Sequence, residues 1–98
     1  MALYEMRTYT LHVGSRGEAV ALYGKLGWPA LKKYEKKLVG YFLSDTGTLN
    51  QIVHLWKFDD DADRRRHGAA IYDDKKFMAF AGKLRPLAIT SAKRASLL

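Results

Sequence analysis

The feature that most constrains the fold is a run of β-branched and aromatic residues at positions 50–58, Asn-Gln-Ile-Val-His-Leu-Trp-Lys-Phe, which follows a turn-rich pentad at 44–48. Such a run predicts a β-strand. Successive side chains of a strand point to opposite faces, so one face carries Asn50, Ile52, His54, Trp56 and Phe58. Both faces are largely apolar in the middle, so we expect both to be covered. Polar groups in such a place need partners, which is typical of a ligand pocket, a subunit interface, or both.

Length and composition favour one small domain over residues 1–98. The sequence contains no cysteine, which excludes disulfides and thiolate chemistry. Its N-terminal residues do not have the pattern of a secretion signal, and no apolar stretch approaches the ~20 residues that cross a bilayer. We therefore expect a cytoplasmic protein that has no membrane partner.

The net charge of +7 and the pI of about 9.8 first suggest a nucleic-acid partner. The distribution of the charges argues against one. The lysines at 32–33 and 36–37 fall on one candidate helix, and the arginines at 64–66 fall on another, directly after a run of aspartates. Basic helix faces without a nucleic-acid motif are usually solvated, so we expect no nucleic-acid partner.

Local signals mark the ends of two segmented helices. Ser15 and Glu18 have the spacing of a capping box, which should start the first helix. The Gly-Trp-Pro sequence at 27–29 should make that helix bend or restart, because proline lacks an N–H group and clashes with the preceding turn. The aspartates at 59–61 and at 73–74 should cap the two segments of the second helix.

Strands are predicted at residues 3–13, 38–43, 50–58 and from 87 to 91, extending toward 97. The resulting β-α-β-β-α-β order predicts an α+β, ferredoxin-like fold, in which helices cover one face of a four-stranded antiparallel sheet. The opposite face would then expose four large apolar residues, which we predict to be Tyr9, Ile52, Trp56 and Phe58. That area is too large for a monomer surface, so we expect a homodimer whose sheets pack face to face.

The same uncovered face should carry the candidate ligand-binding residues, which are Glu5, Arg7, Tyr9, Asn50, His54 and Trp56. In this assignment Tyr4, Met6 and Thr8 are left to face the helices. Arg7 can hold a carboxylate or a phosphate, and His54 can transfer a proton near neutral pH, so these two are the candidate catalytic residues. Interfaces and pockets share this composition, and a satisfied polar network at a dimer interface is the other open interpretation and the one that we favour.

No metal or cofactor is expected. The three histidines, His12, His54 and His67, fall on different predicted elements without a ligand spacing. The aspartates at 59–63 lack the glycine and the ligand order of a calcium loop, which favours helix capping. The sequence also has no phosphate-binding glycine-rich loop and no nucleophile with a paired base.

Four segments resemble the NIPSNAP family: Tyr-Glu-Met-Arg-Thr-Tyr at 4–9, Leu-Val-Gly-Tyr-Phe at 38–42, the stretch at 47–56, and Ala-Asp-Arg at 62–64. The resemblance implies a dimeric α/β barrel formed by two ferredoxin-like subunits. It implies no reaction, because the chemistry of this family is poorly defined. Families with the same barrel include cofactor-free monooxygenases and haem-degrading enzymes, which is an analogy of fold alone.

Two functions therefore stay open. The first is a NIPSNAP-like dimeric domain that binds a small anionic or aromatic molecule, or that acts as a structural module. The alternative is a cofactor-independent monooxygenase or isomerase that uses the barrel cavity.

Overall fold

The computed structural model describes residues 2–97, and the side chains of residues 2–91. Its antiparallel strands are β1 (Leu3–Leu11), β2 (Leu38–Leu43), β3 (Gln51–Phe58) and β4 (Ala88–Leu97). Between β1 and β2 lie α1 (Arg16–Leu22), the π-helical segment η1 (Tyr23–Gly27), α2 (Trp28–Leu31) and the 3₁₀ turn η2 (Lys32–Tyr34). Between β3 and β4 lie α3 (Asp61–Tyr72), α4 (Lys75–Leu84) and the 3₁₀ turn η3 (Arg85–Leu87). The predicted α+β class and order of elements are confirmed.

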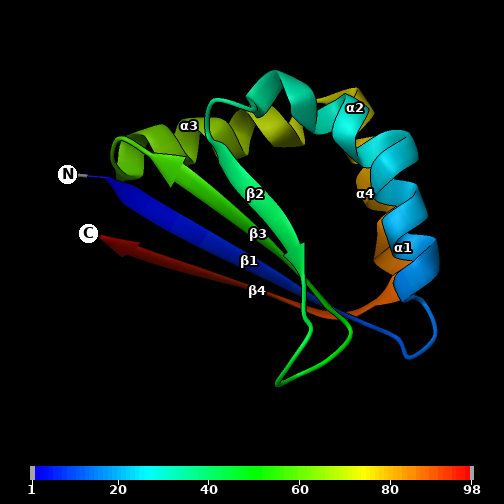
Figure 1. Cartoon of the computed structure of the whole chain (residues 1–98). Helices are drawn as coiled ribbons and strands as arrows, with labels where there is room; N and C mark the ends of the chain where they lie inside the picture. The colour runs from blue at the N-terminus through cyan, green and yellow to red at the C-terminus, as the bar shows by residue number, and fades with distance from the viewer. Residues whose placement is uncertain (1, 98) are drawn as a thin grey trace.

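The strand order is β2-β3-β1-β4, so β1 and β3 occupy the centre of the sheet. The helices arch over one face of this sheet, as Figure 1 shows. In the register of β1 and β3, Arg7 lies opposite His54 and Glu5 lies opposite Trp56. Side chains directly opposite each other in antiparallel strands share a face, so these four residues point the same way.

The face covered by the helices is the reverse of the predicted one. Glu5, Arg7, His54 and Trp56 are buried between the sheet and the helices, and the exposed fraction of Trp56 is 0%. Three residues predicted for the uncovered face, Ile52, Trp56 and Phe58, belong to the hydrophobic core together with residues of α3 and α4. The period-2 alternation shows which residues share a face, but not which face the helices cover. The large rings of β3 pack under the helices because the helices have apolar stripes against which these rings can be buried.

The uncovered face carries Met6 and Thr8, which were predicted to face the helices, together with Phe42, Val53 and Leu55. Met6 is 39% exposed and Phe42 is 54% exposed. Val53 pairs with both Phe42 and Thr8, and Leu55 pairs with Met6, so these side chains form one continuous surface. The prediction of an apolar sheet face outside the helical layer is therefore right, and the prediction of its residues is wrong.

The first helix differs from prediction at its start. Ser15 occupies the N-cap position, but its side chain makes no capping hydrogen bond with any described group. Its backbone already has helical angles, φ −90° and ψ −4°, whereas a capping side chain reaches the first turn from an extended backbone. The predicted capping box is therefore wrong. By contrast, Asp60 accepts from Asp63 N at 2.7 Å and Asp74 accepts from Lys76 N at 3.0 Å, which confirms both aspartate caps.

The helix also passes through the Gly-Trp-Pro sequence without a break. Gly27 and Trp28 both keep helical backbone angles. The change from the π-helical η1 to α2 places Pro29 in the first turn of α2, where its missing N–H group costs least. Figure 1 shows the helical ribbon changing direction between α1 and α2, so the chain bends here while it stays helical. None of the helices within residues 2–97 is long and apolar enough to cross a membrane.

Candidate functional site

A cavity of about 300 Å³ lies between the helix-facing side of the sheet and α4. We call it the polar cavity, because its sheet wall carries Arg7, Tyr9, His54, Thr90 and Ser91. The helical wall is mostly apolar and includes Tyr23, Ile71, Phe77, Met78, Phe80, Ala81 and Leu84. Tyr72, Arg85, Ala88 and Ile89 complete the lining. A mostly apolar cleft with a few convergent polar groups is the usual composition of a ligand pocket.

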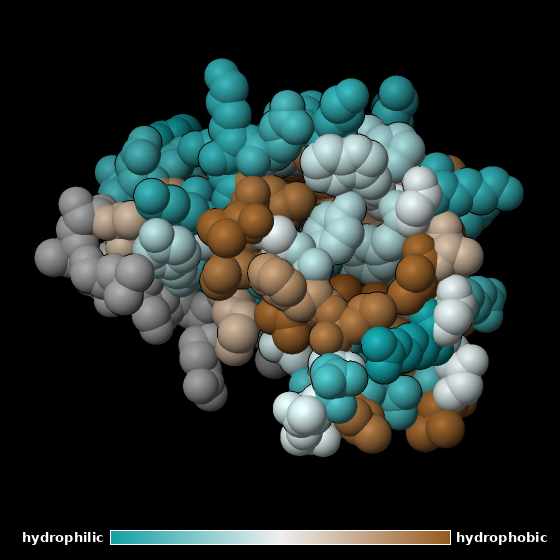
Figure 2. Space-filling model, viewed as in Figure 1, coloured by the Kyte–Doolittle hydropathy of each residue, from teal (hydrophilic) through white to brown (hydrophobic). Residues whose placement is uncertain are grey.

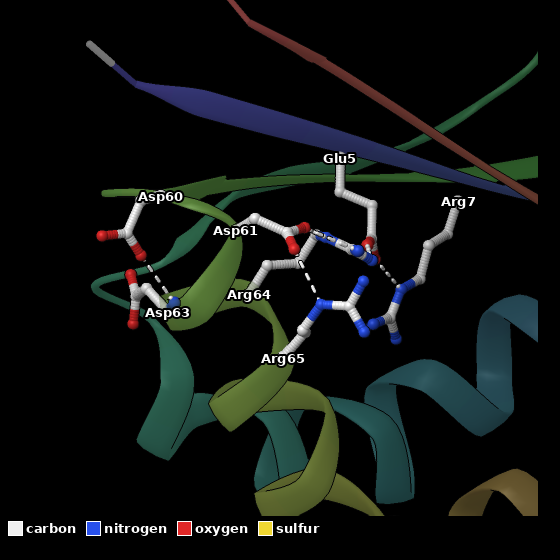
Figure 3. Close-up of polar contacts among 7 residues, drawn as sticks. All are labelled: Glu5, Arg7, Asp60, Asp61, Asp63, Arg64 and Arg65. Atoms are coloured by element: carbon white, nitrogen blue, oxygen red, sulfur yellow. Dashed lines mark hydrogen bonds and ion pairs between the residues drawn. The ribbon is translucent and has the colours of Figure 1, made fainter.

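Arg7, on the wall of the polar cavity, belongs to an ion-pair network centred on the buried Glu5. Arg7 Nε donates to Glu5 Oε1 at 2.5 Å, and Arg64 Nη1 donates to Glu5 Oε2 at 3.0 Å. Arg64 also donates to Asp61 from two of its nitrogens. Figure 3 shows Glu5 between the two arginines, one from β1 and one from α3. The network holds the guanidinium of Arg7 by its Nε atom against the sheet.

The arginines also determine the charge of Glu5. Burial by itself would raise the pKa of this carboxyl group. The hydrogen bonds and positive charges of Arg7 and Arg64 outweigh that effect and hold the pKa of Glu5 below its ordinary value. Glu5 is therefore ionised at neutral pH although only 1% of it is exposed.

His54 lies in a cage of aromatic rings. Its centroid is 5.2 Å from that of Tyr9, 5.4 Å from that of Tyr23 and 5.6 Å from that of Tyr41. The hydroxyl oxygen of Tyr23 lies 2.5 Å from His54 Nε2, within hydrogen-bonding distance. Burial and then the positive charge of Arg7 lower the pKa of His54 to about 3. Burial also raises the pKa of Tyr23, so a neutral imidazole and a neutral phenol share this hydrogen bond at neutral pH.

The structure brings together five of the six predicted site residues. Arg7, Tyr9 and His54 line the polar cavity. Glu5 and Trp56 lie behind Arg7: Glu5 accepts its Nε–H group, and the ring centroid of Trp56 is 5.9 Å from its Cζ atom. This group faces the helices of its own subunit, whereas we predicted that it would face a partner's sheet.

Asn50 is the residue that the structure leaves out of the group. It precedes β3 in the left-handed conformation, with φ 61°, which asparagine tolerates better than most residues. Its backbone oxygen accepts a hydrogen bond from Leu11 N at 2.7 Å. Asn50 therefore shapes the turn into β3 and does not line the polar cavity.

Two residues of the site were missed from the sequence. Tyr23 falls on an apolar stripe of helical spacing, which indicates core packing and gives no sign of its hydrogen bond to His54. Arg64 lies within a run of arginines beside aspartates, which is typical of a solvated helix face. Only the packing of α3 against β1 shows that Arg64 contacts the buried Glu5.

The chemistry of the lining favours an anion. Arg7 and Arg85 are the charged residues among those described around the polar cavity, and both are positive. A guanidinium group can donate two parallel hydrogen bonds to a carboxylate or a phosphate. Among residues 2–97, no group of three or more His, Cys, Asp or Glu side chains is arranged to hold a metal ion.

The sequence and the fold of this chain are similar to those of known proteins. Residues 4–98 match the family model of NIPSNAP. The solved structure of a NIPSNAP family protein from Agrobacterium tumefaciens is similar, with a TM-score of 0.91 and 28% identity over 99% of this chain and 92% of that one. Another, a NIPSNAP family protein with unknown function from the same organism, has a TM-score of 0.88 and 32% identity over 97% of this chain and 86% of that one.

A more distant likeness concerns the fold alone. A mutant of SnoaB, a cofactor-independent oxygenase from Streptomyces nogalater, has a TM-score of 0.65 and 20% identity over 99% of this chain and 92% of that one. No curated protein matches the sequence.

Proposed function

This chain belongs to the NIPSNAP family, and from that premise we propose that it binds a small anionic molecule with an aromatic or apolar body in the polar cavity. The observation that carries the proposal is the buried guanidinium of Arg7 on the wall of a mostly apolar cavity. A charge in such a place is expensive unless it is paired and hydrogen-bonded. A carboxylate on the ligand would supply that pairing.

The partner that Arg7 already has supports this proposal. Glu5 neutralises part of its charge, but Glu5 also accepts from Arg64. The second carboxylate of the network, Asp61, accepts from both Arg64 and Arg65, so two carboxylates serve three guanidinium groups. An anion beside Arg7 would bring the charges closer to balance. The apolar side chains of α4 would then cover the body of the ligand, and Tyr9 would lie beside a ring.

The test compares benzoate with benzamide, which has nearly the same shape but no charge. We expect benzoate to raise the melting temperature of the protein and to bind in calorimetry, and benzamide to do neither. Arg7→Gln should weaken benzoate binding at least tenfold. Arg66→Gln is the matched control, because the side chain of Arg66 is 72% exposed and does not line the polar cavity.

Circular dichroism should show that both variants are folded. If Arg7→Gln unfolds, Glu5→Gln combined with Arg7→Gln removes both members of the ion pair and should give a folded protein that still does not bind benzoate. Equal responses to benzoate and benzamide, or unchanged affinity in a folded Arg7→Gln variant, would refute the proposal.

A second candidate function is cofactor-independent oxygenation or isomerisation of such a ligand. The observation that favours it is the neutral His54, which lies in the same cavity as Arg7 and bonds to Tyr23. Arg7 is one cause of the low pKa of His54, so an anion bound to Arg7 would raise that pKa and make His54 a better base. The fold likeness to an oxygenase agrees with this candidate.

Turnover distinguishes the two candidates. Oxygen consumption and product formation would be measured with hydroxylated aromatic acids that bind to the wild type. For an enzyme, His54→Gln should lower the rate at least a hundredfold and leave the affinity within a few-fold, because general acid–base groups contribute about 10²–10⁴. Binding without any turnover would support the binding function and contradict the enzymatic one.

The proposal includes a homodimer formed through the uncovered sheet face. Its support is the apolar surface of Met6, Phe42, Val53 and Leu55, which lies on the side of the sheet away from the helices. Contiguous apolar patches of this kind mark interaction sites. The polar cavity lies on the opposite side of the sheet, so each subunit would keep its own ligand site.

A further inference from the structure

A second hollow adjoins the polar cavity. It is an apolar groove of about 340 Å³ between α1, η1 and the β2 edge of the sheet. Its lining residues are Val20, Tyr23, Gly24, Tyr41, Leu43 and Ile52, together with Phe42, which also belongs to the uncovered sheet face. Figure 2 shows apolar and aromatic side chains gathered on this face, between the helical layer and the sheet. Tyr23 lines both the apolar groove and the polar cavity, so one side chain is a wall of each.

We infer that the apolar groove and the polar cavity are two parts of one ligand site, in which the groove receives the apolar tail of an anion that Arg7 holds. This inference rests on the binding function proposed above. It adds the class of ligand: a monocarboxylate with an extended apolar tail, such as an arylalkanoic acid, in preference to a compact aromatic acid.

The sheet connects the two hollows through neighbouring side chains. Ile52 lines the groove and His54 lines the polar cavity, and both point to the helix-facing side of β3. Tyr41 of the groove lies opposite His54 in the register of β2 and β3, with ring centroids 5.6 Å apart. A ligand that extends across the sheet from Arg7 would therefore reach the groove next to His54.

By their described lining residues, the apolar groove is uncharged and the polar cavity is positively charged, as a ligand with an apolar tail and an anionic group requires. None of the described residues that line the apolar groove carries a charge, whereas the polar cavity has Arg7. Each hollow alone is at the lower end of the roughly 300–1,000 Å³ of ligand pockets. The groove suits an apolar tail and offers nothing to a second anionic group.

Tyr23 is the residue that would move when a long ligand binds. Tyr23 borders both hollows, and its hydroxyl group is held by the hydrogen bond to His54 Nε2. The next residue, Gly24, lines the groove, and a Cβ atom added there meets no described atom within 4 Å. A larger side chain at Gly24 can therefore fill the groove without displacing the core.

The experiment titrates benzoate, 3-phenylpropionate and 6-phenylhexanoate into the wild type and two variants by calorimetry. We expect affinity to rise along this series, at least tenfold from the first acid to the last. Gly24→Leu should abolish the gain for 6-phenylhexanoate and leave benzoate within twofold. Gly17→Leu is the matched control, since Gly17 is also an exposed glycine of this helical stretch with open space around it but does not line the groove. It should leave all three affinities unchanged.

A second variant tests the wall itself. Tyr23→Ala should join the hollows and strengthen 6-phenylhexanoate binding relative to benzoate. The inference is overturned if affinity does not rise with tail length, if Gly24→Leu weakens benzoate and 6-phenylhexanoate alike, or if it affects neither. In each of these cases the proposed function would still stand, provided that benzoate binds and that its binding depends on Arg7. Failure of every acid to bind to the wild type would overturn both.

Discussion

At the scale of single residues, burial and the nearest charges together decide the protonation of the buried groups. Glu5 is almost fully buried, yet two arginines keep it ionised. His54 has the positive Arg7 as its neighbour, so burial and charge both favour its neutral form. The same arginine therefore keeps a proton off both Glu5 and His54, and a bound anion would relax this constraint on His54.

Stability should fall as the pH falls from 6.5 toward 4. The pKa values of His54 and His67 in the folded protein are about 3 and about 4, below the ordinary value of 6.5. Between these values the unfolded chain binds protons that the folded protein excludes, so acid favours unfolding. His54 alone should cost about 2 kcal/mol at pH 5 relative to pH 7.

Urea unfolding at pH 7 and pH 5 measures this effect. His54→Phe should reduce the difference in unfolding free energy between the two pH values. Phe80→Leu, which changes the core without a titratable group, should lower stability equally at both. An unfolding free energy that does not change between pH 7 and pH 5 would show that the histidines are not held neutral.

At the scale of the elements, the π-helical segment η1 connects helix geometry to the site. It contains Tyr23, which bonds to His54, and Gly27, which lies under the rings of Tyr23 and Phe80. π-helical turns are rare and occur often at functional sites. Here the π-helical turn contains Tyr23, whose hydroxyl group lies within hydrogen-bonding distance of His54 of β3.

The two glycines of η1 should respond to alanine in opposite ways. A Cβ atom at Gly27 would lie 2.9 Å from Phe80 Cε1, so Gly27→Ala should cost about 1–3 kcal/mol through overpacking. Gly24→Ala meets open space and should stabilise the protein by up to ~1 kcal/mol, because alanine is the better helix former. Urea unfolding of both variants checks the prediction, and equal effects would contradict this packing of η1.

The helix caps make a second matched pair. Asp74 accepts from the N–H groups of Lys76 and Phe77 at the start of α4. Asp74→Ala should therefore cost about 1–2 kcal/mol. Ser15→Ala should change the unfolding free energy by less than ~0.5 kcal/mol, as for a surface residue without a capping bond. Thermal and urea unfolding measure both effects. A larger loss of stability for Ser15→Ala would show that Ser15 caps the first helix after all.

At the scale of the whole molecule, the two faces of the sheet differ in what covers them. The helix-covered face holds the polar cavity, the ion-pair network and the core. The other face lies away from the helices and, among the residues whose side chains are described, carries the apolar Met6, Phe42, Val53 and Leu55, so it is the surface proposed for dimerisation. Alternate residues of β1 therefore face the helix-covered side, which holds the polar cavity, and the surface proposed for dimerisation.

A double substitution on the uncovered face tests the dimer. Met6→Glu with Phe42→Glu should give a folded monomer in sedimentation, because the charges would be buried in an interface of about 1,200 Å² or more. Val13→Glu is the control, since Val13 is 88% exposed in the loop after β1. A wild type that sediments as a monomer at micromolar concentration would refute the dimer.

Local rules were sufficient for much of this architecture. The alternation of β1 and β3 placed Arg7 and His54 on one face, and the aspartates at 59–61 and 73–74 marked the starts of α3 and α4. These signals depend on neighbours in the chain, such as the period of a strand or a side chain that bonds two or three residues away. Such signals can therefore be identified from the sequence without knowledge of the tertiary structure.

Contacts between distant segments decided the rest. The sequence determined which residues share a face of the sheet, but only packing determined that the helices cover the face of Trp56 and leave Met6 outside. The hydrogen bond of Tyr23 to His54 joins positions 31 residues apart, and that of Arg64 to Glu5 joins positions 59 apart. Such partners depend on how α1, η1 and α3 pack on the sheet, which no local periodicity specifies.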